Sequence, residues 1–329
     1  MNGSTGAIVA RLPRPRARAI QDPPEAWEHE LAHRAVSLLG RGPTGRHPYR
    51  PLRDADVPAS ATRALAAACA AGELWQLLVI PASVRPVASG RRWRWVATPT
   101  EVLGLGKAAV GLWVARSQEG GPLDLPRGGA TGAPPPMADL AGEVRETIPL
   151  GDLAFVEDVR ILLSGRLTFV AKDRALRVRY STVARYDMRP ALDDVRATLA
   201  GEPLALPAPA VPPLPVKWQI LAQTPSIRLN DRDATVLYDE PRTGRRRTRP
   251  TLVALTPYEL VVAREPTQGL SVDRYGVDSV HVARHRIELI SPVGASLAIR
   301  ARDADLHIDV GERLVAEARE AFAGLLPWA

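Results

Sequence analysis

The sequence predicts an α+β chain dominated by β-structure, in which two tandem small β-barrels, each capped by a C-terminal helix, follow a short helical N-terminal region. Three observations predict this fold. Short segments of alternating polarity dominate from residue 75 onward, several of them recur in the same order in both halves, and each half ends in an amphipathic helix. The 329 residues, of which 46% are apolar, suffice for two domains with cores of their own.

Proline- and glycine-rich stretches set the domain boundaries. The N-terminal stretch has four prolines and no apolar period, and the stretch between the two β-rich halves has six prolines, which favours a stiff, extended linker. The predicted segments are a disordered arm (1–24), a helical region (25–71), a first β-domain (72–201) with a flexible loop (117–137), the linker (202–216) and a second β-domain (217–329).

Within these segments the elements follow in a simple order. The helical region should contain a helix over 25–40 and a second helix that begins at Ser60 as N-cap and is closed by Gly72. Six or seven short strands and one helix of three to four turns should follow in each β-domain. Seven short antiparallel strands expose two edges, and closure into a barrel removes them, with the final helix covering the open end.

Blocks of similar sequence recur across the proline-rich linker. Their order is the same in both halves and the gaps fall in glycine- and proline-rich loops, so we interpret them as an internal duplication. The matched blocks are WQLLVIPASVR (75–85) with WQILAQTPSIR (218–228), VATPTEVLGLG (96–106) with ALTPYELVVAR (254–264), and LTFVAKDRALRV (167–178) with LAIRARDADLHI (297–308).

Each half resembles the bacterial pleckstrin-homology-like domains of the PH and GRAM type. The segments that carry the resemblance are Ala70–Glu73 before the first strand, the strand starts ATPTEVLGLG and ALTPYELVVA, and the terminal helix. The usual arginine of the family is replaced by Glu101 and Glu259. The resemblance implies two tandem PH-like barrels that bind a phosphoinositide, a peptide or another protein, and an all-β barrel unrelated to that family is the alternative.

Arginines cluster at the two turns that match the ligand-binding hairpin of that family. Guanidinium groups pair bidentately with phosphate or carboxylate, so the clusters could clamp a polyanion, although a charged turn that only keeps the protein soluble is the alternative. We therefore expect a non-enzymatic recognition or adaptor protein that binds a protein partner or an anionic ligand such as an acidic lipid headgroup. The candidate ligand-binding residues are Arg91, Arg92 and Arg94 in the first half and Arg242, Arg245, Arg246, Arg247 and Arg249 in the second.

Charge is concentrated at the N-terminus. Residues 1–53 hold nine arginines and four acidic residues, a net charge of +5, so only +2 of the chain's +7 remains for the other 276 residues. A nucleic-acid-binding domain normally carries a strongly basic stripe on its surface, because its affinity comes from neutralising the phosphates of the nucleic acid. Nucleic-acid binding is therefore a lesser alternative, carried by the N-terminal arginine arm.

Composition also restricts the class of protein. The single cysteine, Cys69, excludes a disulfide scaffold and a cysteine-based zinc cluster. No run approaches 18 apolar residues, so we expect no membrane span, and the first twenty residues lack the apolar block of a secretory signal. We expect a cytoplasmic protein, which could also be peripheral to a membrane.

One motif points to an enzyme instead. His29, Glu30 and His33 form an HExxH on a predicted helix, where the two histidines share a face and could hold zinc while Glu30 activates water. Over these five residues the chain resembles the zincin metallopeptidases, which implies zinc as cofactor and Glu30 as the catalytic residue. However, Val36 and Leu39 occupy the Gly and His places of the extended motif, and only 28 residues precede it. We expect no cofactor, and the zinc metallopeptidase is the alternative.

The metal content of the protein tests this choice. Two histidines are only two ligands, whereas a catalytic zinc needs a third protein ligand and groups that orient the histidine rings. We expect the purified full-length chain to contain well under one equivalent of zinc by elemental analysis, with His29→Ala leaving any binding activity intact. One zinc per chain, together with peptide cleavage that Glu30→Gln eliminates, would establish the metallopeptidase.

Overall fold

The structure is a computed structural model, and it divides into two compact units. Unit 1 comprises Met1–Gly106 and Gly111–Glu146, and unit 2 comprises Lys107–Val110 and Thr147–Ala329. The residues that the structure describes are 57–69, 74–80, 83–89, 92–116, 140–161, 164–181, 185–206, 211–222, 234–239, 249–265 and 276–329.

A four-stranded sheet, most of which belongs to unit 1, packs against one helix. Its strands, in sheet order, are β1 (Leu74–Ile80), β4 (Glu101–Gly106), β5 (Ala109–Ala115) and β6 (Gly142–Pro149). The helix α2 (Ala59–Ala68) buries Ala61 and Leu65, and a Cβ at Gly104 of β4 would press on the Leu65 side chain. The helix begins after Pro58 rather than at Ser60, whose hydroxyl instead donates a hydrogen bond to the Leu140 carbonyl at 2.7 Å.

Two further strands of unit 1 extend this sheet as a hairpin. In β2 (Ser83–Ser89) and β3 (Arg92–Thr98), Ser83 is opposite Thr98 and Ser89 is opposite Arg92. The β1–β4 pairing continues the same register, with Ile80 opposite Glu101. The two pairs of strands, β1–β4 and β2–β3, therefore follow one antiparallel register.

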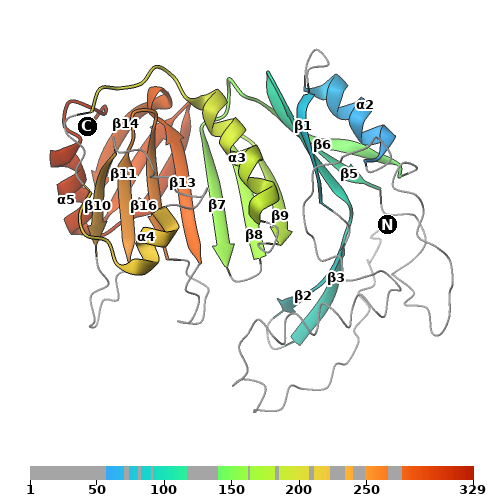
Figure 1. The fold of residues 1–329 in the computed structure, drawn as a ribbon, viewed down its shortest axis with the longest axis horizontal. Coiled ribbons are helices and arrows are strands. Elements are labelled where there is room, and N and C mark those ends of the chain that lie inside the picture. Colours follow the sequence, from blue (N-terminus) through green and yellow to red (C-terminus); the bar gives the residue numbers. More distant parts are fainter. Residues whose placement is uncertain are drawn as a thin grey trace, which may run out of the picture. The chain divides into compact units, whose positions relative to one another are not determined.

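A seven-stranded antiparallel sheet is the centre of unit 2 (Figure 1). Its central strands are almost continuously apolar because both of their faces are covered, as the buried stretches of β11 and β12 show. In sheet order the strands are β10 (Thr235–Asp239), β11 (Thr251–Leu255), β12 (Glu259–Arg264), β13 (Val277–Ala283), β7 (Phe155–Ile161), β8 (Ser164–Val170) and β9 (Ala175–Ser181).

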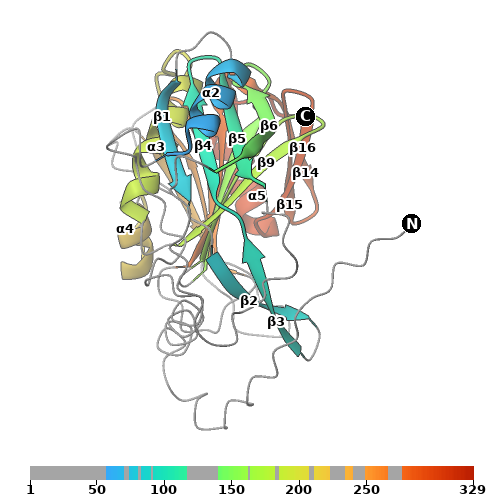
Figure 2. The same ribbon diagram turned by 90° about the vertical axis from the view of Figure 1, so that its right-hand side faces the viewer.

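Helices cover one face of this sheet, and a second sheet covers part of the other (Figure 2). On one side lie α3 (Arg185–Leu199) and α4 (Val216–Ala222), and α4 buries Trp218 and Leu221 against β10–β13. On the other side, a three-stranded sheet and α5 (Glu312–Ala321) pack on apolar residues of β11–β13. This sheet consists of β14 (Ile287–Val293), β15 (Ser296–Ala301) and β16 (Ala304–Asp309), with a 3-10 turn, η5 (Arg284–Arg286), before it.

The predicted β-dominated α+β class is confirmed, but the prediction of two separate barrels needs correction. Among the described residues no sheet closes into a barrel, and β13 pairs with β7, Val280 lying opposite Glu157. Strands from both sides of residues 202–216 therefore share one sheet. The pairing has a physical reason, because β7 and β13 would otherwise present unpaired backbone groups at exposed edges.

Both halves of the chain nevertheless follow the same order of elements. Four strands of one sheet come first, three consecutively paired strands follow, and a helix ends each half. In the first half these are β1, β4, β5 and β6, then β7–β9, then α3. In the second half they are β10–β13, then β14–β16, then α5.

Not all matched sequence blocks share a structure. Trp75 lies in β1, whereas Trp218 lies in α4, where it and Leu221 bury the same side of a helix. Pro215 directly precedes α4, and proline is tolerated at the start of a helix but not within a ladder. The described parts of these two blocks, 75–80 and 218–222, therefore differ in structure.

Among the described residues, no helix is both long and apolar enough to span a bilayer.

A glycine in β8 allows a tyrosine to cross that strand. Arg160, Gly165 and Tyr180 lie in register on β7, β8 and β9. The Tyr180 hydroxyl donates a hydrogen bond to Asp158 Oδ1 on β7 at 2.7 Å, so its ring passes directly over Gly165. Any Cβ at position 165 would overlap that ring, which explains a glycine in the middle of a strand.

We expect Gly165→Ala to destabilise the protein by about 1–3 kcal/mol, because the ring or the strand must move to make room for the methyl group. Gly151→Ala is the matched control, since a Cβ there meets nothing within 4 Å. Urea unfolding monitored by tryptophan fluorescence measures both. Equal effects of the two substitutions would show that the close approach of Tyr180 to position 165 is wrong.

Candidate functional site

The first predicted arginine cluster lies at the tip of the β2–β3 hairpin. Ser89 is opposite Arg92, so Gly90 and Arg91, which lie outside the described residues, connect the two strands. Arg92 and Arg94 belong to β3. Arg85 belongs to β2, where its backbone is opposite Val96.

The second predicted cluster lies in the connection between β10 and β11. Asp239 and Thr251 are opposite each other, so residues 240–250 join the ends of two paired strands. Arg249 is exposed, and its carbonyl accepts a hydrogen bond from the Thr251 hydroxyl at 3.0 Å. The other four arginines of this connection, Arg242, Arg245, Arg246 and Arg247, lie outside the described residues.

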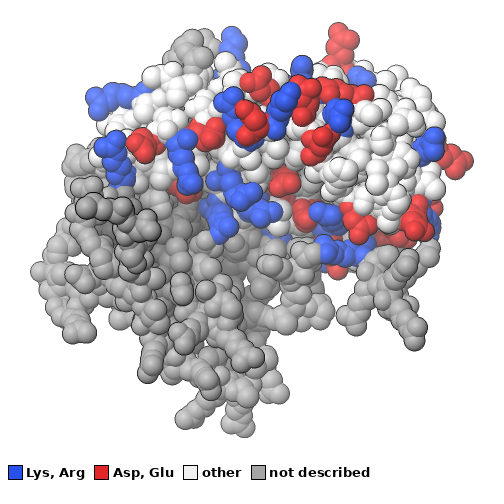
Figure 3. Space-filling model, turned by 180° about the vertical axis from the view of Figure 1, so that it is seen from behind, with Lys and Arg blue, Asp and Glu red and all other residues white. Residues whose placement is uncertain are grey.

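The charge of this connection differs from that of the described surface. It holds five arginines and one acidic residue, Glu240, whereas many arginines of the described strands and helices pair with a carboxylate. On one face of the molecule, basic and acidic side chains accordingly lie intermixed (Figure 3). The pairs are Arg116–Glu143, Arg160–Asp158, Arg174–Asp173, Arg196–Glu259, Arg264–Asp278, Arg300–Asp305 and Arg313–Glu317.

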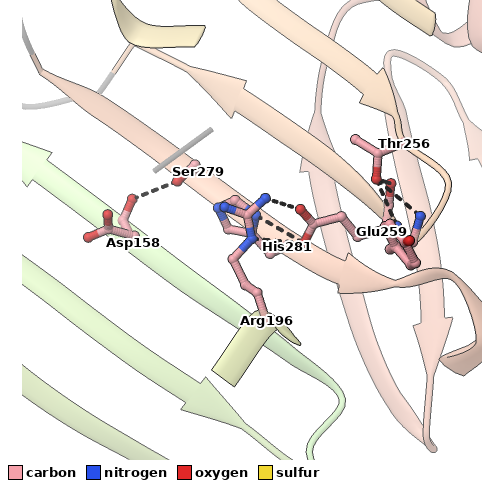
Figure 4. Close-up of polar contacts among 7 residues, drawn as sticks. Asp158, Arg196, Thr256, Glu259, Ser279 and His281 are labelled. Atoms are coloured by element: carbon pink, nitrogen blue, oxygen red, sulfur yellow. Dashed lines mark hydrogen bonds and ion pairs between the residues drawn. The ribbon is translucent and has the colours of Figure 1, made fainter. Parts of the chain in front are cut away.

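Glu259 of β12 is the centre of a nearly buried charged cluster (Figure 4). Arg196 of α3 donates from Nε to Glu259 Oε2 at 3.2 Å and from Nη2 to Oε1. His281 of β13 places Nδ1 3.4 Å from Oε2. The side chains of Arg196, Glu259 and His281 are 11%, 12% and 2% exposed, so the cluster is a tie between α3 and the sheet rather than a site that a substrate can reach.

The environment of Glu259 controls its protonation. Burial raises the pKa of the carboxyl group, but Arg196 and His281 lower it more strongly, and the pKa falls to about 2.

A Thr-Pro-x-Glu motif, residues 256–259, builds the turn that precedes the Glu259 side chain. Thr256 Oγ1 accepts hydrogen bonds from the backbone N–H groups of Tyr258 and Glu259 at 3.2 and 3.0 Å.

A second buried cluster lies beside it, on the neighbouring strands β7, β9 and β13. Asp158 Oδ2 accepts hydrogen bonds from Arg160 Nε and Nη2, both at 2.9 Å, and Oδ1 accepts one from Tyr180. The Ser279 hydroxyl of β13 donates to the backbone carbonyl of Asp158 at 3.2 Å (Figure 4). Burial and the Asp158 carboxylate raise the pKa of Tyr180. The phenol therefore keeps its proton and donates a hydrogen bond to that carboxylate. This cluster is also inaccessible and structural.

The residues of the alternative zinc site, His29, Glu30 and His33, lie outside the described residues. In the part of the chain that the structure describes, no group of three or more His, Cys, Asp or Glu side chains is placed to hold a metal ion. Cys69 is a buried free thiol at the end of α2, and burial raises its pKa, so it is poorly suited to act as a nucleophile.

Comparisons with models of protein families, with curated proteins and with solved structures give no match to this chain. The resemblance to PH-like domains therefore remains a prediction from the sequence. Of the predicted ligand-binding arginines, the described residues show one side chain, the exposed Arg249, and the two buried clusters stabilise the sheet.

Glu259→Gln should destabilise the protein by about 3 kcal/mol near neutral pH, because Arg196 would remain buried without its anion. The wild-type carboxylate has a pKa of about 2, below its ordinary value of 4.5, so its contribution is complete above pH 4.5 and is lost as the pH falls toward 2.

The difference in unfolding free energy between wild type and Glu259→Gln should therefore shrink over that pH range, as measured by urea unfolding at a series of pH values. Glu143→Gln, at an exposed carboxylate, is the control and should change stability by less than about 1 kcal/mol. A difference that stays constant from pH 7 to pH 2 would contradict the assigned ion pair.

Proposed function

We propose that the chain is a non-enzymatic recognition protein that binds acidic lipid headgroups through the arginines of its two hairpin connections. The observation that carries the proposal is the excess of five arginines over one acidic residue in residues 240–250, between the paired ends of β10 and β11. Guanidinium groups bind phosphate oxygens bidentately, so a sequence this rich in arginine suits an anionic headgroup.

The β2–β3 hairpin supports the same function in unit 1. Arg92 and Arg94 alternate with Trp93 and Trp95 along the sequence of β3, and Arg85 belongs to the paired strand β2. Arginine beside tryptophan suits the polar headgroup region of a membrane, where an indole ring finds both apolar and polar surroundings. We infer that each of the two arginine clusters is a contact point for an acidic surface.

We also infer that the two halves are copies of one PH-like unit. The order of four strands, three strands and a helix in each half supports this inference, as does the recurrence of sequence blocks in the same order. In such a unit the connection between the first two strands carries the ligand-binding residues, according to the family resemblance. Both arginine clusters occupy that place, since one lies between β1 and β4 and the other between β10 and β11.

The triple substitution Arg245/Arg246/Arg247→Ala tests the proposal in sedimentation with phosphatidylcholine vesicles that contain phosphatidylserine. Each basic residue near an acidic membrane contributes about 1 kcal/mol, so the triple variant should bind about 100-fold more weakly than wild type at the same melting temperature. The matched control is Arg116/Arg174/Arg300→Ala. It removes the same charge from exposed positions outside the two arginine-bearing connections and should bind like wild type.

Three other results would overturn the proposal. Wild-type protein that ignores acidic vesicles would show that the arginines only solubilise the turn. Equal losses in the triple variant and its control would show that net charge alone acts. Salt-sensitive binding to DNA or RNA, without vesicle binding, would assign the arginines to nucleic acid instead.

A further inference from the structure

Arg286 is a buried arginine, and no carboxylate of the described residues lies within 4 Å of its guanidinium group. It belongs to the 3-10 turn η5, between β13 and β14, and is 7% exposed. Its Nη1 donates hydrogen bonds to the backbone carbonyls of Leu150, at 2.7 Å, and of Leu153. Arg160, which is equally buried, instead has the Asp158 carboxylate at 2.9 Å. Arginine is almost never buried without a paired anion, so the charge of Arg286 favours an anion nearby.

Two further arginines lie beside Arg286. Arg302, in the turn between β15 and β16, donates its backbone N–H to the Arg286 carbonyl at 3.3 Å. The Arg302 side chain is exposed and forms no ion pair with a described residue. Arg284 donates from Nη2 to the Glu202 carbonyl at 3.2 Å, and its Nε is buried without an acceptor in the described part of the chain. Buried polar atoms almost always have a partner, so this N–H marks a place for a water or an ion.

The backbone of Arg302 is held in an unfavourable conformation. Arg302 and Asp303 form the two-residue turn between Ala301 and Ala304, and their φ angles are 46° and 60°. Such turns normally use Asn or Gly, because other residues are less stable in the left-handed region. The Asp303 carboxylate already pairs with Lys172, at 3.3 Å. Strained residues cluster at functional sites, so a charged side chain kept at such a position points to a use of that side chain.

His285, the middle residue of η5, lies among these three arginines. Arg286 Nε donates a hydrogen bond to His285 Nε2 at 3.4 Å. Partial burial lowers the pKa of His285, all three arginines lower it further, and no described carboxylate acts in the opposite direction. Burial and Arg302 also lower the pKa of Arg286, to about 10, and Asp152 offsets only part of this effect. The described residues therefore leave the positive charge at this turn without a close anion.

We propose that η5 and the β15–β16 turn form a binding site for a phosphoryl group, to which Arg284 and Arg302 donate. The buried charge of Arg286 strengthens this binding from behind. Guanidinium groups bind phosphate oxygens bidentately, and a phosphoryl group offers three acceptor oxygens where a carboxylate offers two. The bound anion adds negative charge beside His285, so the imidazole becomes easier to protonate.

This site is separate from the arginine-bearing connections of the proposed function. The turn η5 follows the end of β13 at which Ala283 is opposite Glu259. Residues 240–250 lead to the end of β11 at which Thr251 is opposite Arg264, and Arg264 is at the other end of β12 from Glu259. The two places therefore lie at opposite ends of the same strands. The phosphoryl group belongs either to a soluble ester or to a lipid headgroup.

Proton NMR of the histidine side chains in the full chain, titrated with glycerol 3-phosphate, tests the site. The His285 resonance, assigned with His285→Gln, should shift saturably, and the pKa of His285 should rise when the ester is bound. Arg302→Gly removes the guanidinium group and relaxes the positive φ, so it should weaken binding about tenfold without lowering the melting temperature. The matched control Arg300→Gln neutralises an arginine of β15 that Asp305 holds at 2.9 Å, and it should bind like wild type.

Other results separate this site from the hairpin arginines and identify the source of the phosphoryl group. Arg245/Arg246/Arg247→Ala should keep the His285 shift, whatever its behaviour with phosphatidylserine vesicles. If Arg302→Gly also weakens sedimentation with phosphatidic acid vesicles, the ligand is a lipid headgroup, and if it does not, the ligand is a soluble ester. A wild-type His285 resonance that does not respond to glycerol 3-phosphate, or equal binding by Arg302→Gly and wild type, would overturn the proposal.

Discussion

The pairing of β13 with β7 is the constraint on which the architecture of unit 2 depends. It joins three strands that precede residues 202–216 to four strands that follow them, and it leaves neither β7 nor β13 as an edge. Buried polar contacts fix this junction from one face. Ser279 of β13 donates to the Asp158 carbonyl of β7, and His281 of β13 lies against Glu259, which Arg196 holds from α3. A buried charge without its partner is costly, so these contacts penalise alternative pairings of the strands.

Arginine has two distinct uses in this chain. In the described strands and helices it pairs with carboxylates, and the most buried example, Arg160 with Asp158, ties neighbouring side chains into the β7–β9 cluster. In residues 240–250 five arginines accompany a single acidic residue, Glu240. Because self-repulsion disfavours such clusters unless something offsets it, the second use is the one that we connect with anion recognition.

Sequence patterns predicted local features well and long-range pairing poorly. Alternating polarity predicted the strands around Leu167–Val178 and Leu297–Ile308, and both segments form paired strands that precede a helix. The Thr-Pro-x-Glu motif was recognised, and in the second half it forms the turn between β11 and β12. No pattern within either half showed that β7 would pair with β13, because an edge strand has the same alternation whether its neighbour comes from its own half or the other. The matched starts of the Trp75 and Trp218 blocks form a strand and a helix respectively, because a short apolar run fits either element.

The candidate site was predictable only in part. Runs of arginine are visible in a sequence, so the clusters at 91–94 and 242–249 could be named from it. The roles of Gly165 and Glu259 could not be predicted, because they depend on partners elsewhere in the sequence, Tyr180 in the first case and Arg196 in the second.

Cross-strand nuclear Overhauser effects in the deuterated full-length chain measure the junction most directly. In antiparallel strands, backbone protons of opposite residues lie close enough for strong effects. We predict them between Val280 and Glu157 and between Asp278 and Val159, together with slow amide exchange along both strands. Rapid exchange in β7 and β13, with no cross-strand effects between them, would show that the two halves form separate sheets and would contradict the shared seven-stranded sheet.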